Sequence, residues 1–137
     1  MTGEQSFPRR CRLLKPAEFK NVFDRPVVSS DRLFKVFARP GTSSLCRIGM
    51  AVSRKVDGRA VVRNRIKRTI RESFRLNYPV VSQDNRLGRD FVIVASPPAA
   101  RTAGAQLRSS LSNHWRTIDQ KLEKRSGDSI KQTNHKE

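Results

Sequence analysis

Apolar residues recur at helical spacing in three segments of the chain, which we therefore predict to be helices. The first begins near Pro16, a residue type favoured in the first turn of a helix, and ends before Pro26. The second covers residues 60–76 and the third residues 102–124. The apolar residues that share one face in each segment are Phe19, Val22 and Phe23, then Val62, Ile66, Ile70 and Phe74, and then Leu107, Leu111, Trp115, Ile118 and Leu122.

Four further segments have the pattern of strands. Residues 27–30 predict a short edge strand, and residues 33–39 and 47–53 alternate between two faces. Residues 90–96 are apolar on both faces, which suits a central strand. The alternation separates Phe34, Val36 and Ala38 from Leu33, Lys35 and Phe37, and it separates Ile48, Met50 and Val52 from the small residues Gly49 and Ala51. Such small residues allow another backbone or a ligand to approach the strand closely.

The order helix, strands, helix, strand, helix predicts an α+β fold, a small α/β sandwich with a mixed sheet. The two longer helices are expected to cover one side of the central strands, which leaves the other face available for binding. Residues 1–14 are expected to form a basic arm outside the core, and residues 15–124 a single α/β sandwich domain. Residues 125–137 are expected to be a disordered polar tail.

The charge of the chain points to a polyanionic partner. A formal net charge of +17 on 137 residues exceeds what solubility requires, so RNA, DNA or an anionic membrane surface are the candidates. No apolar run approaches the roughly 18 to 20 residues of a spanning helix, and the N-terminus lacks the apolar core of a secretory signal. Cys11 and Cys46 lack zinc-ligand spacing and fit a reducing compartment. We therefore expect a soluble, cytoplasmic protein without a membrane role.

The positive charge is concentrated between Ser53 and Arg75, where nine Arg and Lys stand against two acids. Exposed charges at most sites only solubilise a helix, but that interpretation is weaker for this segment. Like charges four residues apart repel by a few tenths of a kcal/mol per pair, so a row of them is costly without a bound anion. We call this row the basic ridge; it consists of Arg63, Lys67, Arg71 and Arg75.

Residues for independent catalysis are scarce. The chain has two histidines, His114 and His135, and we expect His114 to be a boundary residue of the last helix. Its twelve acids are scattered without a DxD or HExxH pattern, so we expect no metal site in the protein. Asp57, an acid within the cationic segment, is expected to cap the following helix. The sequence therefore favours a binding protein over an independent catalyst.

The phenylalanines have two interpretations. Each one taken alone is expected in the core. However, the strand at 33–39 carries Phe on both faces, and one of these faces must look away from the core covered by helices. An aromatic ring on that face, beside a basic helix, is suited to stacking unpaired bases.

The segment AVVRNRIKRTIRESFR, preceded by RIGMAVSRKV and by PAEFKNVF, closely resembles the protein component of bacterial ribonuclease P, whose hallmark is the RNR helix. The resemblance covers about Arg12 to Trp115. It implies a left-handed strand-helix-strand crossover, an exception to the usual right-handed rule. It also implies that a large RNA subunit with bound Mg²⁺ hydrolyses the 5′ leader from precursor tRNA, while the protein, one per RNA and without a cofactor of its own, positions the substrate.

The resemblance assigns roles to particular residues. The helix residues that would meet the catalytic RNA and nearby substrate phosphates are Arg63, Asn64, Arg65, Lys67, Arg68 and Arg71. The residues before the helix that would flank the same region are Ser53, Arg54 and Lys55. The aromatic residues that would line a cleft for the single-stranded leader are Phe19, Phe23 and Phe37. Arg and Lys neutralise phosphates, and aromatic rings stack on bases without demanding a sequence.

Two other functions compete with this one. A ribosomal or general RNA-binding protein would also explain the charge and the sandwich, but it would not require the RNR helix beside a strand that carries aromatic residues. A self-sufficient basic ribonuclease is the alternative among enzymes. Binding that depends strongly on leader length would favour the ribonuclease P function over general RNA binding. The independent ribonuclease is excluded if the protein alone leaves precursor tRNA intact.

Overall fold

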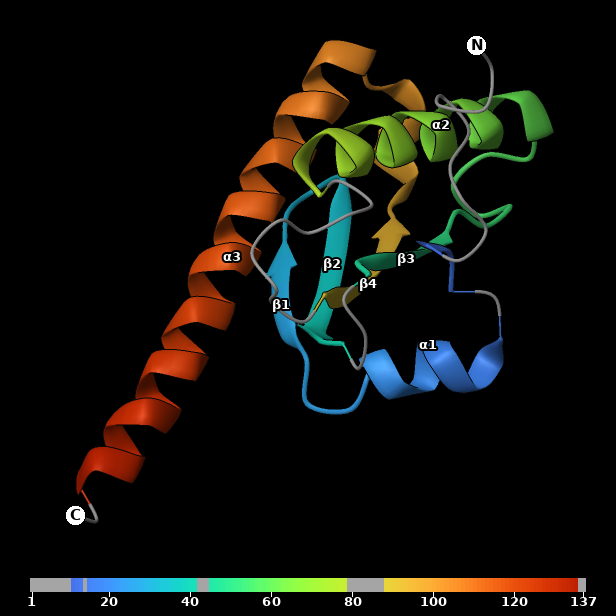
Figure 1. The fold of residues 1–137 in the computed structure, drawn as a ribbon. Coiled ribbons are helices and arrows are strands. Elements are labelled where there is room, and N and C mark those ends of the chain that lie inside the picture. The colour runs from blue at the N-terminus through green and yellow to red at the C-terminus, as the bar shows by residue number, and fades with distance from the viewer. Residues whose placement is uncertain (1–10, 14, 42–44, 79–87, 136–137) are drawn as a thin grey trace, which may run out of the picture.

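The computed structural model of the chain describes residues 11–13, 15–41, 45–78 and 88–135. Within these residues the helices and strands follow the predicted order, with boundaries that differ by one or two residues at most ends (Figure 1). The elements are α1 (Pro16–Val22), β1 (Val27–Ser30), β2 (Phe34–Pro40), β3 (Arg47–Ala51), α2 (Ala60–Asn77), β4 (Arg89–Ala95), the 3-10 helix η2 (Pro97–Arg101) and α3 (Gly104–His135).

The described strands form one mixed sheet in the order β1-β2-β4-β3. β2 pairs antiparallel with β1 and β4, whereas β3 runs parallel to β4, and α2 makes the crossover between these parallel neighbours. The α+β class, the mixed sheet, the edge position of β1 and the central position of β4 are therefore confirmed. The hand of the crossover stays a prediction.

The main core lies between one face of the sheet and the helices α2 and α3. The predicted α2 stripe is confirmed, because Ile66, Ile70 and Phe74 are at most 1% exposed. Trp115 of α3 packs edge-on against Phe74 and donates a hydrogen bond from Nε1 to Ser73 Oγ at 2.8 Å. Burial of each such large apolar side chain stabilises the fold by about 1.5–3 kcal/mol.

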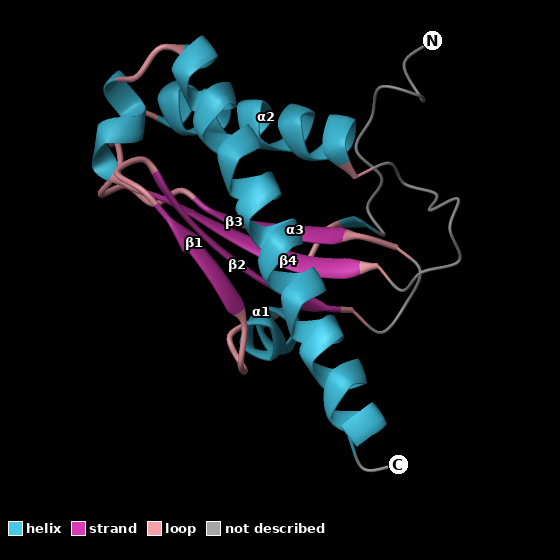
Figure 2. Cartoon of the chain, turned by 90° about the vertical axis from the view of Figure 1, so that its left-hand side faces the viewer, coloured by secondary structure: helices cyan, strands magenta, loops and turns pink. Residues whose placement is uncertain are grey.

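The opposite face of the sheet carries α1. Figure 2 shows α2 and α1 on opposite sides of the strands. Val22 is fully buried and forms a second apolar cluster with Leu13 and Val92, against which Phe19 and Phe37 pack. This face is therefore partly covered at α1, and Phe37 points away from the main core as predicted.

The N-terminal boundary of the core lies earlier than predicted. Cys11 and Leu13 are 1% and 4% exposed, and Leu13 N–H donates a hydrogen bond to Ile48 O at 2.9 Å. Arg12 forms a parallel bridge with Ile48, so residues 11–13 extend the sheet beyond β3. The prediction that residues 1–14 stay outside the core is wrong here, because the alternation Cys, Arg, Leu is that of an edge strand.

The last helix is longer than predicted. α3 runs from Gly104 through His135, whereas the apolar stripe predicts an end near Lys124. The prediction that residues 125–137 are disordered is therefore wrong as far as His135, because these residues continue the helix.

None of the described helices is both long enough and apolar enough to cross a membrane. Neither Cys11 nor Cys46 forms a disulfide bond in the described structure.

Candidate nucleic-acid interface

The segment between β3 and α2 is a tight turn that presents two cations. Val56 N–H donates to Ser53 O at 3.0 Å, and Lys55 N–H donates to Ser53 Oγ at 3.3 Å. Val56 is buried, whereas Ser53, Arg54 and Lys55 are exposed. The turn thus anchors itself through Val56 and leaves the side chains of Arg54 and Lys55 free to reach an anion.

Asp57 does not cap α2, which corrects the sequence prediction. The N-cap position is Arg59, which has no side-chain cap bond, and Asp57 Oδ1 accepts the Arg59 backbone N–H at 2.8 Å. The guanidinium of Arg59 donates to the same carboxylate at 3.1 and 3.0 Å. These hydrogen bonds lower the pKa of Asp57 to about 2. Asp57 therefore fixes the turn that precedes the helix.

Arg63 is held against the same turn. Its Nη1 donates to Asp57 O at 3.0 Å and to Gly58 O at 2.8 Å. A guanidinium has five N–H donors, so these two bonds fix its position and leave others for a ligand. The first turn of α2 contains no acidic residue, which leaves the positive end of the helix dipole uncompensated on the helix itself.

Arg65 lies on the opposite flank of the helix. Two residues along an α-helix turn the side chain by about 200°, and Arg65 Nη2 donates to Ala100 O of η2 at 3.2 Å. The structure thus separates the two arginines of the RNR segment, which the sequence prediction treats as one group. Asn64, between them in the sequence, is exposed.

The basic ridge continues along α2 and meets the N-terminal segment. Lys67 and Arg71 are half-buried, and Arg68 is exposed. Burial lowers the pKa of Arg71, and the nearby charges of Arg12 and Arg68 lower it further. Arg12 therefore belongs to the same cationic surface, although sequence analysis assigned it only to a basic arm outside the core.

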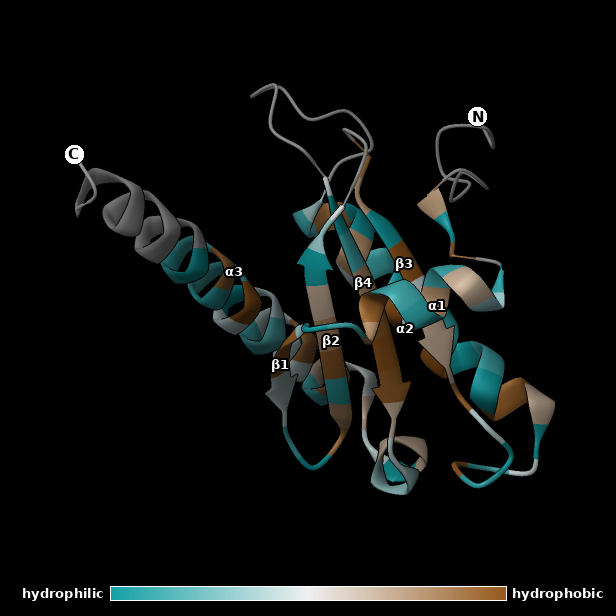
Figure 3. Cartoon of the chain, turned by 90° about the horizontal axis from the view of Figure 1, so that it is seen from below, coloured by the Kyte–Doolittle hydropathy of each residue, from teal (hydrophilic) through white to brown (hydrophobic). Residues whose placement is uncertain are grey.

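The predicted leader-binding phenylalanines gather on the sheet face that carries α1; we call Phe19, Phe23 and Phe37 the aromatic surface. The rings of Phe23 and Phe37 meet edge to face with centroids 4.8 Å apart. Phe23 is 47% exposed, whereas Phe19 and Phe37 are half-buried. Lys35 Nζ lies 5.4 Å from the Phe37 ring centroid and adds a cation that the prediction did not include. Figure 3 views the molecule from this side, with α1 in front of the sheet.

Phe19 sits where β3 has no side chain. A Cβ atom at Gly49 would lie 2.6 Å from the Phe19 ring, closer than side chains tolerate. The predicted close approach at this strand is thus made by a side chain, the Phe19 ring, and not by another backbone or a ligand as the sequence suggested. The glycine sets how closely α1 approaches the sheet and thereby fixes the position of the aromatic surface.

Charged residues hold α1 in place. Arg47 of β3 donates to both oxygens of Asp90 at 2.9 and 2.8 Å and to Glu18 Oε2 of α1 at 2.8 Å. At the other end of α1, Arg39 Nη1 donates to Asn21 O at 3.0 Å and to Asp24 O at 2.8 Å. Hydrogen bonding to Asp90 raises the pKa of Arg47. Sequence analysis missed these positioning residues, because their contacts depend on strand register.

The basic ridge and the aromatic surface meet around the β3 edge. Arg12 pairs with β3 and lies near Arg71 of the ridge, and Phe19 packs over Gly49 of the same strand. A nucleic acid that contacts α2 along the ridge can therefore reach the exposed ring of Phe23 and the half-buried ring of Phe37 by passing this edge.

The described residues contain no cluster of three or more His, Cys, Asp or Glu side chains that could hold a metal ion. His114 is 3% exposed and therefore buried, which corrects its prediction as a boundary residue. Its Nδ1 lies 2.6 Å from Ser29 Oγ, and its Nε2 lies 3.1 Å from Asp31 Oδ2. These contacts link α3 to β1 and its following turn, so His114 has a structural role.

A mixed sheet with a basic crossover helix on one side and aromatic rings on the other defines a small α+β protein with a surface suited to nucleic acid. The chain belongs to the Ribonuclease P family, because residues 7–119 match the model of that family. Its relatives are protein components of ribonuclease P, an enzyme of tRNA processing.

Individual relatives agree with this assignment. The chain is 44% identical over 110 residues to the ribonuclease P protein component of Methylococcus capsulatus. This match covers 80% of this chain and 81% of the relative. The Staphylococcus aureus RNase P protein structure matches with a TM-score of 0.67 and 30% identity over 78% of this chain and 94% of that one. A mutant of the S. aureus protein, described as having defective mRNA degradation activity, matches with a TM-score of 0.70 and 28% identity over 81% and 90% of the two chains.

Proposed function

We propose that this protein binds the catalytic RNA of ribonuclease P and the 5′ leader of precursor tRNA, and thereby assists endonucleolytic removal of the leader. The observation that carries the proposal is the junction of the basic ridge with the aromatic surface around β3. A cationic helix alone would fit any RNA-binding protein. Exposed rings beside it suit a partner that combines folded RNA with an unpaired strand.

The chain's own residues bind and orient RNA. The basic ridge, with Arg68 and the turn residues Arg54 and Lys55, neutralises phosphates of the catalytic RNA and releases their counterions. Phe23 and Phe37 stack unpaired leader bases without reading their sequence, and Lys35 attracts the leader backbone. Mg²⁺ held by the RNA subunit supplies the hydrolytic chemistry. One protein acts with one RNA in the cytoplasm, where precursor tRNA is processed.

Binding measurements test the leader role. The complex of this protein with a bacterial ribonuclease P RNA is titrated with precursor tRNAs whose leaders differ in length, and with mature tRNA. We expect affinity to rise as the leader lengthens and then to level off once the aromatic surface is occupied. Equal affinity for all of these tRNAs would favour a general RNA-binding protein instead.

A further inference from the structure

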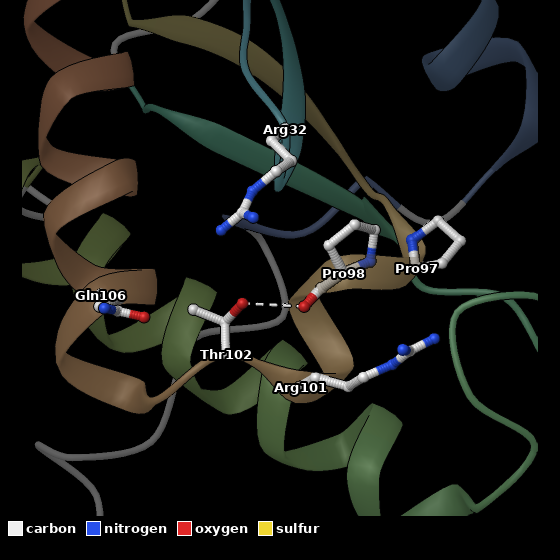
Figure 4. Close-up of a pocket in the computed structure, with 6 residues that line it drawn as sticks. All are labelled: Arg32, Pro97, Pro98, Arg101, Thr102 and Gln106. Carbon is white, nitrogen blue, oxygen red and sulfur yellow. Dashed lines mark hydrogen bonds between the residues drawn. The ribbon is translucent and has the colours of Figure 1, made fainter.

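A basic pocket lies on the Arg65 flank of α2, outside both the basic ridge and the aromatic surface. It has a volume of about 350 Å³ and is bordered by the β1–β2 turn, η2 and the first turn of α3. Figure 4 shows Arg32 extending toward Thr102 and Gln106, while Arg101 extends from η2 away from Arg32, on the side where Pro97 lies. The lining residues are Arg32, Pro97, Pro98, Arg101, Thr102 and Gln106.

The two arginines of this pocket are available for a ligand. Both are exposed, and within the described part of the chain neither guanidinium donates a hydrogen bond or pairs with a carboxylate. The acid next to Arg32 is already engaged, because the carboxylate of Asp31 accepts the Leu33 and Phe34 N–H groups at 2.8 and 2.9 Å and the Ser110 hydroxyl at 2.6 Å. The first turn of α3 contains no acidic residue.

The backbone beside the pocket is rigid. Thr102 Oγ1 donates to Pro98 O at 2.8 Å, and Ala99 is fully buried. Pro97 and Pro98 restrict the backbone further, since the ring of each proline fixes φ. A rigid border lowers the entropy that a bound group must overcome to order the site.

Arg65 connects this pocket to the RNR helix. Its hydrogen bond to Ala100 O places it next to Arg101 along η2. Arg65, Arg101 and Arg32 are all exposed, and Arg32 and Arg101 border the same pocket. This group of cations lies on the Arg65 side of α2, opposite to the hydrogen bonds that Arg63 makes with the β3–α2 turn.

We propose that Arg32, Arg65, Arg101 and Gln106 form a second phosphate-binding surface, the η2 surface, which takes neighbouring phosphates of a folded RNA backbone. The inference rests on the proposed function and extends it, because RNA then contacts α2 on both flanks. Guanidinium groups bind phosphate oxygens through paired N–H donors, and the Gln106 amide supplies a further donor. The two arginines of the RNR segment then serve two separate stretches of RNA backbone.

The salt dependence of RNA binding tests the η2 surface. The double variant Arg32→Ala/Arg101→Ala is compared with Arg116→Ala/Lys124→Ala, which removes the same charge from exposed positions farther along α3. Each lost phosphate contact lowers the slope of log K against log salt by about 0.9. With a bacterial ribonuclease P RNA, we expect the pocket variant to lose about 1 to 2 units of slope relative to the control. Equal slopes for the two variants would overturn the proposal.

Two further measurements, one on a variant of the basic ridge and one on phosphate binding, show which proposal fails if the pocket variant and its control have equal slopes. Lys67→Ala/Arg71→Ala removes two cations of the basic ridge; if it binds as wild type does, the proposed function itself fails. If it weakens binding while the pocket variant matches its control, only the η2 surface is refuted. Inorganic phosphate is titrated by NMR at constant ionic strength. Phosphate binding that Arg32→Ala/Arg101→Ala abolishes without any change in RNA slope would mean a site for free phosphate, which also overturns the proposal.

Discussion

At the scale of single residues, the members of the aromatic surface have different roles: one packs against the sheet and the others present their rings to a ligand. Phe19 lies against Gly49 and is part of the support, whereas Phe23 is 47% exposed and meets the ring of Phe37. Their edge-to-face arrangement fixes the rings before a base arrives, which limits the entropy lost on binding. Replacing Phe23 or Phe37 should therefore lower mainly the affinity for the leader.

Replacing Phe37 by Ala should weaken binding of precursor tRNA by the protein–RNA complex and leave binding of mature tRNA unchanged. Stacking of a base on an aromatic side chain contributes about 1–3 kcal/mol, so the affinity should fall by a factor of about 5 to 150. Leu76→Ala is the control, because Leu76 is 75% exposed and lies on α2 away from the aromatic surface. An equal loss with mature tRNA would show that Phe37 supports the fold and does not contact the leader.

At the scale of elements, α1 depends on contacts that come from three strands. Arg47 of β3 joins Glu18 to Asp90 of β4, Arg39 of β2 binds the end of α1, and Phe19 fills the space above Gly49. A helix of seven residues is too short to be stable alone, so these contacts keep it formed. The position of α1 is thus a property of the sheet.

Gly49→Ala should therefore destabilise the protein and displace α1. The added Cβ would lie 2.6 Å from the Phe19 ring, and overpacking of this kind costs about 1–3 kcal/mol. Urea unfolding measures the loss in the free energy of unfolding, with Gly58→Ala as the control because no atom lies within 4 Å of its added Cβ. Adding Phe19→Leu should restore part of the loss. If Gly49→Ala and Gly58→Ala unfold alike, α1 does not depend on this contact.

At the scale of the whole molecule, charge dominates. A net charge of +17 opposes the compact state at low salt, and the basic ridge concentrates that repulsion on α2. An anion that binds the folded array and not the unfolded chain shifts the equilibrium toward the fold. The protein is thus expected to be weakly folded when free at low salt and to gain structure with RNA or small anions.

Sulfate should raise both helicity and the free energy of unfolding more than chloride does at equal ionic strength. A ligand at a hundredfold excess over its Kd contributes about 2.7 kcal/mol per site. Because sulfate also strengthens burial generally, the Lys67→Ala/Arg71→Ala variant serves as the control and should respond less. Circular dichroism that shows the same helicity with and without sulfate would contradict this account.

Apolar periodicity was sufficient to predict the main elements, because burial imposes a regular spacing on helices and strands. The stripe of Ile66, Ile70 and Phe74 and the doubly apolar β4 are examples. Apolar periodicity did not predict the buried positions of Cys11 and Leu13, because a strand of three residues next to several arginines is too short to show a clear alternation. It also failed at the end of α3, where the polar segment after Lys124 carries no apolar stripe.

The geometry of the site was less accessible from sequence. The separation of Arg63 from Arg65 follows from helix geometry, but the partner of Arg65 depends on where η2 packs. The bonds between Arg47 and Asp90 depend on strand register, which joins residues 43 positions apart. Asp57 was expected to cap α2 because an acid near a helix start commonly does so, yet Arg59 provides it with a closer partner.

The most direct test of the central claim is cleavage of a 5′-labelled precursor tRNA at low Mg²⁺. A bacterial ribonuclease P RNA is assayed with and without this protein, beside a lane that contains the protein alone. We predict cleavage at the mature 5′ end only when both components are present. Cleavage by the protein alone would identify an independent ribonuclease, and tight RNA binding without enhanced cleavage would contradict the proposed function.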